Sequence, residues 1–142
     1  MVHDAGDANP VTTMVLKALT VWLLIFAVEV AHGVLRTLYL VPLIGDLRSR
    51  QIGVAVGSGL ILLVTWLTVK WIAPRTPRQR RGVGFLWVTL MIGAEVATGH
   101  YAFGYPWARI TEDFDPTRGG FLAFGMLVLY LAPGWMARLR GL

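Results

Sequence analysis

Two glutamates, Glu29 and Glu95, lie within long apolar stretches of the chain, where a charged group is costly. A carboxylate well inside a membrane span costs a few kcal/mol by insertion scales. Such a group therefore needs a cationic partner, a water-filled cavity or a bound proton. Because these requirements are typical of sites that bind or pass protons and cations, the two glutamates are the first candidates for function.

Glu29 begins a polar stripe on its own helix. Residues at i, i+3, i+7 and i+10 share one helical face. On this face the sequence places Glu29, His32, Arg36 and Tyr39. The stripe around the second glutamate keeps the acid and the tyrosine but lacks the His and the Arg. Its members are Glu95, Thr98, Ala102 and Tyr105. We expect the glutamates to accept protons or cations, His32 to act as relay or ligand, and Arg36 to control their protonation.

Two cofactors are compatible with these side chains. Glu29, His32 and Glu95 could hold a hard or borderline divalent metal. A symmetric di-iron site needs two Glu-x-x-His motifs, and the second copy here reads Glu95-x-x-Thr98. Haem b is the other possibility, with His32 and His100 as ligands. His100 lies about 140° around the helix from Glu95, which counts against both imidazoles reaching one iron.

The candidate binding residues are therefore Glu29, His32, Arg36, Glu95 and His100. A purely structural alternative is an internal ion pair between Glu29 and Arg36, or a proton shared between the two glutamates. No catalytic residue is predicted, because the chain has no Cys, no G-x-S-x-G motif and no P-loop. Enzymatic chemistry is therefore not expected.

The elements that carry these residues are membrane helices. Of the 142 residues, 56% are hydrophobic and 15% are charged, whereas soluble domains have about 25% charged residues. A span needs about 20 apolar residues. Four stretches qualify, at about 14–39, 52–73, 83–103 and 120–137. The sequence thus predicts an all-α membrane protein, a single four-helix transmembrane domain with no room for a soluble one. Asp4 and Asp7 precede the first span, so we expect it to be retained rather than cleaved as a signal peptide.

The basic residues indicate the orientation. With four spans, both termini share one side with the loop between the second and third spans. That side carries Lys17, Lys70, Arg75, Arg78, Arg80, Arg81, Arg138 and Arg140. The other side carries Arg36, Arg48, Arg50, Arg109 and Arg118. The excess predicts cytoplasmic termini in a bacterial inner membrane. The net charge of +5 then reflects the orientation of the spans in the membrane, and no nucleic-acid partner is expected. Trp71, Trp135 and Trp107 suit interfacial anchors.

A weak internal repeat relates the two halves at an offset of 66 residues (95 − 29). Matching pairs are Glu29 and Glu95, Tyr39 and Tyr105, Ile44 and Ile110, Asp46 and Glu112, Gly53 and Gly119, and Gly59 and Gly125. The units, about 18–73 and 84–139, would be related by a pseudo-twofold axis along the membrane normal. The small-residue pairs Gly53/Gly57 and Gly119/Ala123 are predicted to be helix-packing surfaces.

The outer loops carry further charges. Asp115-Pro116 is predicted to cap the fourth span. Arg118 and Arg109 would balance the remaining charge of this loop, and Arg48 and Arg50 could equally pair with Glu112 and Asp113 across the outer face.

These features together predict a small protein that binds or passes an ion, a proton or a metal, embedded in the lipid bilayer as a homo-oligomer or within a larger complex. The alternatives are a non-catalytic subunit of an electron-transfer complex that holds haem or quinone, and a structural subunit.

Overall fold

The computed structural model describes residues 9–142, of which 87% are helical and none lies in a strand. Within that range four helices are long and apolar enough to cross a membrane. They are Pro10–Ile44, Asp46–Ile72, Pro77–Ala102 and Leu122–Leu139. The predicted all-α membrane protein with four spans is confirmed at this level. Asp4 and Asp7, on which the retention of the first span was argued, lie outside the described residues.

In chain order the elements are α1 (Pro10–Leu35), η1 (Arg36–Leu40), α2 (Val41–Ile44), α3 (Asp46–Ile72), α4 (Pro77–Val96), η2 (Ala97–Ala102), α5 (Trp107–Asp113), η3 (Pro116–Arg118) and α6 (Leu122–Leu139). The first and third spans begin at caps rather than at their apolar residues. Asn9 caps α1, and Thr76 forms a capping box with Gln79 at the start of α4. Proline follows each cap, as expected at a first helical position.

The helices η1 and η2 are π-helical turns that continue α1 and α4. Pro42 follows η1 and Pro106 follows η2 within a few residues. Proline offers no N–H and collides with the carbonyl four residues earlier in a regular α-helix. The wider π turn η1 relieves this conflict, so the first span continues through Pro42 to Ile44, whereas the third span ends with η2 at Ala102, before Pro106. Such turns are frequent at functional sites, and here one follows the membrane glutamate of each half.

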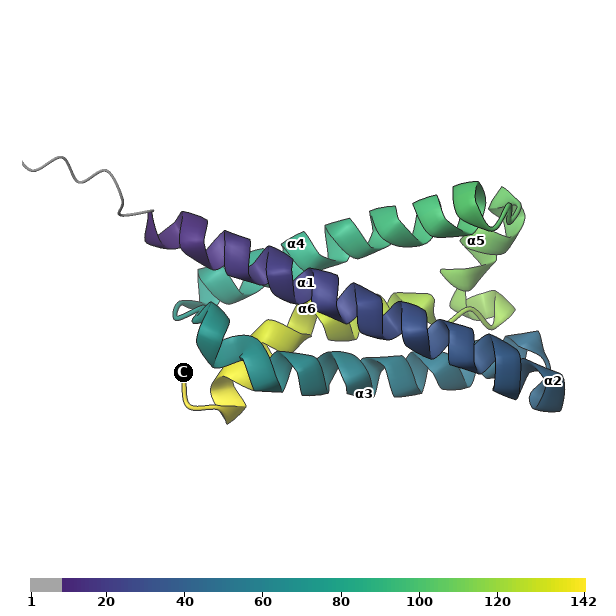
Figure 1. Cartoon of the computed structure of the whole chain (residues 1–142), viewed down its shortest axis with the longest axis horizontal. Helices are drawn as coiled ribbons and strands as arrows, with labels where there is room; N and C mark the ends of the chain where they lie inside the picture. The colour runs from purple at the N-terminus through teal and green to yellow at the C-terminus, as the bar shows by residue number, and fades with distance from the viewer. Residues whose placement is uncertain (1–8) are drawn as a thin grey trace, which may run out of the picture.

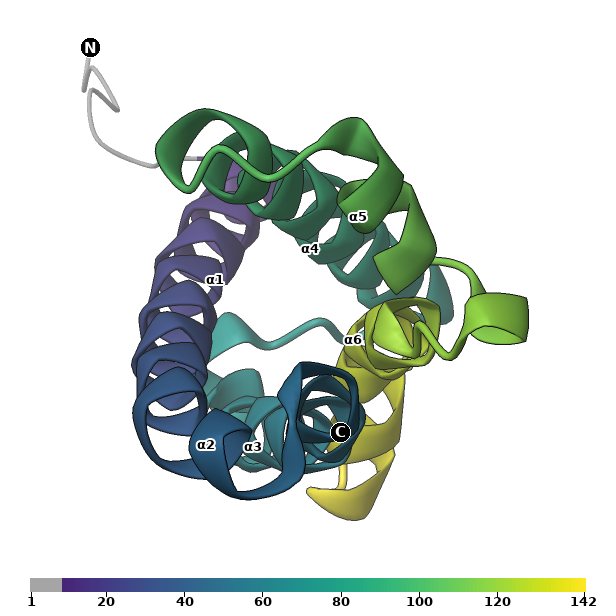
Figure 2. The same cartoon turned by 90° about the vertical axis from the view of Figure 1, so that its right-hand side faces the viewer.

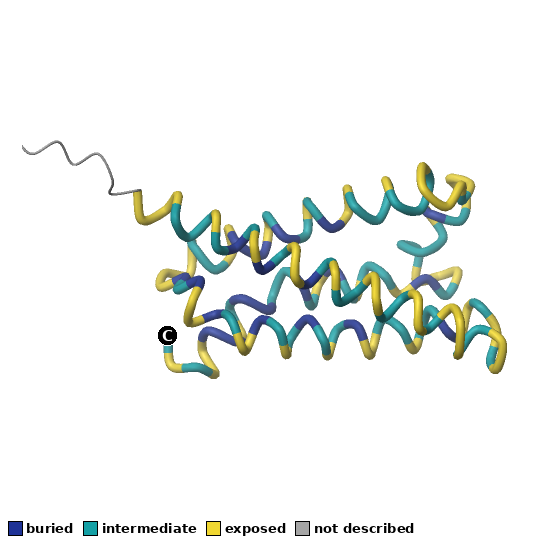
Figure 3. Tube along the Cα trace, viewed as in Figure 1, coloured by how far each residue is buried: buried dark blue, intermediate teal, exposed yellow. Residues whose placement is uncertain are grey.

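The four long helices surround a common axis in the order α1, α3, α6, α4 (Figure 2). Helices α1 and α4 run in one direction, and α3 and α6 run in the other (Figure 1). The bundle is packed most tightly in the half near the α3–α4 loop, where the buried residues gather (Figure 3). There the indole of Trp87 is fully buried and donates to the carbonyl of Ala18 at 2.9 Å, which joins α4 to α1.

The other half of the bundle is open. Helices α1 and α4 diverge toward the end that carries α2 and α5 (Figure 1). Close approach between α4 and α6 occurs at Gly84, where a Cβ atom would collide with the backbone carbonyl of Tyr130. Small residues therefore hold the helices together on one side while the opposite side leaves space between α1 and α4.

The segment before α6 differs from the prediction in two respects. Asp115 does cap a helix with Pro116 in its first turn, but the helix is the three-residue η3 and not the fourth span. Gly119 follows with a φ of 83° and lies outside α6, which begins at Leu122. The predicted Gly119/Ala123 packing surface on the fourth span is therefore wrong, because Gly119 provides the left-handed turn that ends η3.

Candidate functional site

A cavity of about 530 Å³ occupies the open half of the bundle and reaches the protein surface. Its polar lining comes from six elements and the loop before α5. These side chains are Glu29 and His32 on α1; Arg36 and Thr37 on η1; Arg50, Gln51 and Ser58 on α3; Glu95 on α4; Thr98 on η2; Tyr105 in the loop; and Arg109 and Asp113 on α5. The deeper lining is apolar and includes Phe26, Ile61, Met91, Met126 and Leu129. The two predicted glutamates therefore face the same space.

Glu29 enters the cavity beside His32. Its Oε2 atom lies 3.8 Å from the Nδ1 atom of His32, and both side chains are about one-fifth exposed, at 21% and 19%. The other oxygen, Oε1, is buried without a hydrogen-bond partner. Gly57 of α3 provides the room for this carboxylate, since a Cβ atom at position 57 would lie 2.6 Å from Oε2.

Arg36 is held by α3 rather than by a glutamate. Its Nη1 atom donates to the hydroxyl of Ser49 at 2.8 Å, and Ser49 is fully buried. Gly53 leaves space for the stem of the arginine, because a Cβ atom there would lie 2.8 Å from Cδ. The Gly53/Gly57 pair was predicted to be a helix-packing surface. In the structure it also accommodates two polar side chains of α1.

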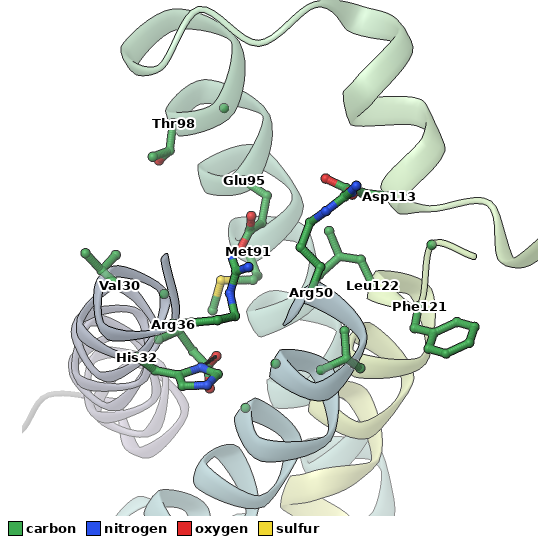
Figure 4. A pocket seen from close by; sticks show the side chains of 18 of the residues that line it. Val30, His32, Arg36, Arg50, Met91, Glu95, Thr98, Asp113, Phe121 and Leu122 are labelled. Carbon is green, nitrogen blue, oxygen red and sulfur yellow. Dashed lines mark hydrogen bonds and ion pairs between the residues drawn. The ribbon is translucent and has the colours of Figure 1, made fainter. Parts of the chain in front are cut away.

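Neither glutamate forms an ion pair with a lysine or arginine within 4.0 Å among residues 9–142. Figure 4 shows Arg36 reaching from α1 toward the middle of the cavity and Glu95 pointing into it from α4. The alternative of an internal Glu29–Arg36 ion pair is therefore not what this structure contains. The three charged groups share the cavity without direct neutralisation.

The mouth of the cavity is closed on one side by a network of paired charges. Arg50 contacts Asp113 of α5 and lies 3.0 Å from Asp46 of its own helix. Arg109 of α5 reaches Asp46 at 3.5 Å and packs over the ring of Tyr105 at 4.0 Å. The pairing of Arg50 with Asp113 was predicted from the sequence and is confirmed. The opposing charges come from both halves of the chain, so the network joins them.

Three residues of the predicted site and its stripes lie outside the cavity lining, namely His100, Tyr39 and Ala102. The Nδ1 atom of His100 is 2.9 Å from the carbonyl oxygen of Tyr105, and the His100 ring stacks on Trp107 at 3.9 Å, outside the cavity lining. Tyr39 was expected on the stripe of Glu29, but it is 69% exposed and does not line the cavity. Arg36 and Tyr39 both lie in the π turn η1, which changes the helical period, so a phase extrapolated at 3.6 residues per turn fails beyond Arg36.

The cofactor predictions can be compared with this geometry. Within residues 9–142 no group of three or more His, Asp or Glu side chains is placed to hold a metal ion. Glu29, His32 and Glu95 line one cavity without forming such a group. His32 and His100 do not line the same cavity, as the helical geometry of the sequence indicated. That the chain binds a divalent metal and that it binds haem b both stay predictions.

The sequence did not indicate two parts of the site. Ser49 carries no signal of its own, because a lone serine near a helix start is usually a cap. Nothing in the sequence indicated Gln51, and Arg109 was expected only to balance charge on the outer face, yet both line the cavity. Only the fold of α5 back over the bundle brings Arg109 to it.

No protein-family model, curated protein or solved structure matches this chain.

Proposed function

We propose that this chain is an integral protein of a bacterial inner membrane that binds or passes a proton or a small cation at Glu29 and Glu95. One observation carries the proposal. Two carboxylates from different membrane helices line one cavity, and neither is paired with a lysine or arginine within 4.0 Å in the described residues. Because an unpaired carboxylate in a membrane span is costly, the cavity must offer water, a proton or a cation, and we assign the last two to the glutamates.

The charge distribution supports an orientation with both termini in the cytoplasm. The α3–α4 loop and the C-terminus lie at the same end of the bundle (Figure 1), and that end carries the basic cluster Arg75–Arg81. By the positive-inside rule this end faces the cytoplasm. The cavity, at the opposite end, then opens toward the periplasm.

The side chains around the glutamates have distinct proposed roles. His32 lies beside Glu29 and would relay a proton or add a ligand. Arg36, fixed by Ser49, holds one positive charge in the cavity without occupying either carboxylate. His100 would act on the site only through Tyr105, whose carbonyl oxygen it contacts and whose side chain lines the cavity.

We also propose that the two halves descend from a duplication. The glutamates occupy corresponding positions, each first helix contains a π turn, and corresponding helices run in the same direction (Figure 1). A twofold axis through the bundle would place corresponding helices on opposite sides, whereas α1 lies beside α4 and α3 beside α6 (Figure 2). The duplication is therefore proposed without that axis. A single four-helix unit is small for a complete pathway, so we expect a homo-oligomer or a larger complex.

Liposome flux measurements test the function. Purified protein is reconstituted and proton or Na⁺ flux is driven by an imposed gradient. We expect E29Q and E95Q to reduce the flux at least about tenfold, as expected for loss of a buried charge contact. The matched control is E112Q, because Glu112 is at the same end of the molecule but does not line the cavity. Wild-type flux in both cavity variants would overturn the proposal.

A further inference from the structure

The charges of the cavity and of the network at its mouth do not balance, although the lining by itself carries three arginines and three carboxylates. At the mouth, Arg50 and Arg109 are paired with Asp113 and with Asp46, which lies outside the lining, so two positive charges meet two negative ones. The remaining charged side chains of the lining are Glu29, Glu95 and Arg36, which leaves one negative charge when His32 is neutral. In a low-dielectric environment such an excess is neutralised by one monovalent cation or one proton.

The size of the cavity narrows the choice of cation. A volume of about 530 Å³ falls in the range of about 300–1,000 Å³ that is usual for pockets that bind small organic molecules. A water molecule takes up only about 30 Å³, so an inorganic ion would share this space with many waters, whereas an organic molecule can displace them. The volume suits an organic molecule better than a metal ion.

The chemistry of the walls agrees with the size. The deeper lining is apolar and includes Phe26, Ile61, Met91, Met126 and Leu129. These side chains offer no ligand to a hydrated ion but complement an apolar body, and an aromatic face adds an attraction for a cationic group. No metal-binding group of three His, Asp or Glu residues exists in the described part of the chain.

The carboxylates of Glu29 and Glu95 are also left available to accept a cationic ligand. The Oε1 atom of Glu29 is buried without a partner, and Gly57 keeps space open around the same group. Ser49 holds Arg36 by a hydrogen bond of 2.8 Å, so the arginine is not drawn into an ion pair with either glutamate. A cationic ligand therefore finds a vacant acceptor that no internal side chain has filled.

We infer that the cavity binds one singly charged organic cation with an apolar body, such as a substituted ammonium, whose cationic head lies between Glu29 and Glu95 and whose apolar part contacts the deep lining. This inference rests on the proposed function, because it identifies the class of cation that the same two carboxylates accept. It adds two requirements, a stoichiometry of one and an apolar substituent.

Binding calorimetry in zwitterionic phosphatidylcholine nanodiscs tests it. The probe is benzyltrimethylammonium, and its neutral isostere neopentylbenzene and Na⁺ are the comparison ligands. We expect one benzyltrimethylammonium per chain, and at least about tenfold weaker binding in E29Q and E95Q. E112Q should bind like the wild type, and E29D, which keeps the charge, should recover part of the affinity of E29Q.

A size variant tests whether the ligand occupies the apolar space. Gly125 lines the cavity, and a Cβ atom there would lie 3.6 Å from Val54, so G125L should fold and fill part of the space. We expect it to weaken benzyltrimethylammonium binding at least about tenfold, and wild-type affinity in G125L would contradict the inferred position of the apolar part.

Four further outcomes would overturn the inference. Equal binding of the neutral isostere would remove the need for charge, and two cations per chain would contradict the charge count. Glutamate-dependent proton or Na⁺ flux without benzyltrimethylammonium binding would leave the proposed function standing and the organic ligand excluded. Absence of both binding and flux would overturn the two proposals together.

Discussion

The two glycines on α3 show how single residues shape this site. In a soluble helix each glycine would cost about 0.5–1 kcal/mol relative to alanine. At Gly53 and Gly57 the missing Cβ atom is what lets Arg36 and Glu29 lie against α3. The sequence indicated small residues at this helix face, and general packing rules in membranes assign them to backbone contact. The structure shows that the long polar side chains of Arg36 and Glu29 occupy part of that space.

Alanine at position 57 should therefore impair the site. A Cβ atom would lie 2.6 Å from Oε2 of Glu29, so the carboxylate must move from its place beside His32. We expect G57A to reduce glutamate-dependent flux at least about tenfold, because a displaced ionised group loses contacts of this order. The matched variant is G59A, since nothing lies within 4 Å of a Cβ atom there.

G59A should retain wild-type flux and raise the free energy of unfolding by up to about 1 kcal/mol through helix propensity. Unfolding titrated with SDS and the liposome assay together give both quantities. Equal flux in G57A and G59A would show that the space at Gly57 has no functional role.

At the scale of the elements, the sequence predicts where a side chain lies around its helix only as long as the helix keeps 3.6 residues per turn. The stripe of Glu29, His32 and Arg36 is correctly placed because all three precede or begin the π turn η1. Tyr39 follows the start of η1, and its predicted position on the stripe is wrong. Pro42 is visible in the sequence, but whether proline produces a kink, a break or a π turn depends on how the neighbouring carbonyls are satisfied. That outcome depends on the surrounding chain and not on the local sequence.

The turn η3 is an element whose stability should depend on pH. The Oδ1 atom of Asp115 accepts hydrogen bonds from the hydroxyl of Thr117 at 2.6 Å and from its amide at 3.0 Å. These bonds, led by the hydroxyl, lower the pKa of Asp115 below its ordinary value. A carboxyl with a depressed folded-state pKa stabilises the fold above the pKa of the unfolded chain, and this contribution is lost as the pH falls through the folded-state pKa.

NMR of the Thr117 amide in detergent micelles measures this effect. We expect its proton resonance to move upfield as Asp115 is protonated and the cap weakens. D115N should abolish the titration and keep the turn, because asparagine is also an effective N-cap. A Thr117 resonance that titrates identically in D115N would show that another group is responsible.

At the scale of the whole molecule, the sequence predicted the number of spans and the meeting of two distant glutamates in one cavity. Both follow from the cost of polar groups in lipid, which acts on each residue separately. The order of the helices around the bundle does not follow in the same way. Lipid chains are as apolar as leucine, so no hydrophobic force selects one neighbour over another, and detailed packing decides. The side-by-side position of α1 and α4 could therefore not be derived.

The charge network at the mouth joins the two halves, and its energy can be measured by a double-mutant cycle. Arg50 and Asp113 are only 19% and 26% exposed, whereas Arg118 and Asp115, 3.8 Å apart, are 71% and 40% exposed. We expect a coupling energy of about 1 kcal/mol or more for R50Q with D113N, and about zero for R118Q with D115N, because solvent screens the exposed pair. SDS-titrated unfolding of the four single and two double variants provides both values. Equal coupling in the two pairs would show that the network does not hold the halves together.

The uneven packing of the bundle, tight around Trp87 and open around Glu29, has an electrical consequence. A transmembrane voltage falls mainly across whatever resists the movement of ions. In the proposed orientation, water in the cavity brings the outside potential close to the glutamates, so most of the field is focused on the packed half. A cation that reaches Glu29 from outside therefore crosses little of the voltage. Passage onward past Trp87 would involve nearly all of it, about 2.3 kcal/mol per elementary charge at 100 mV.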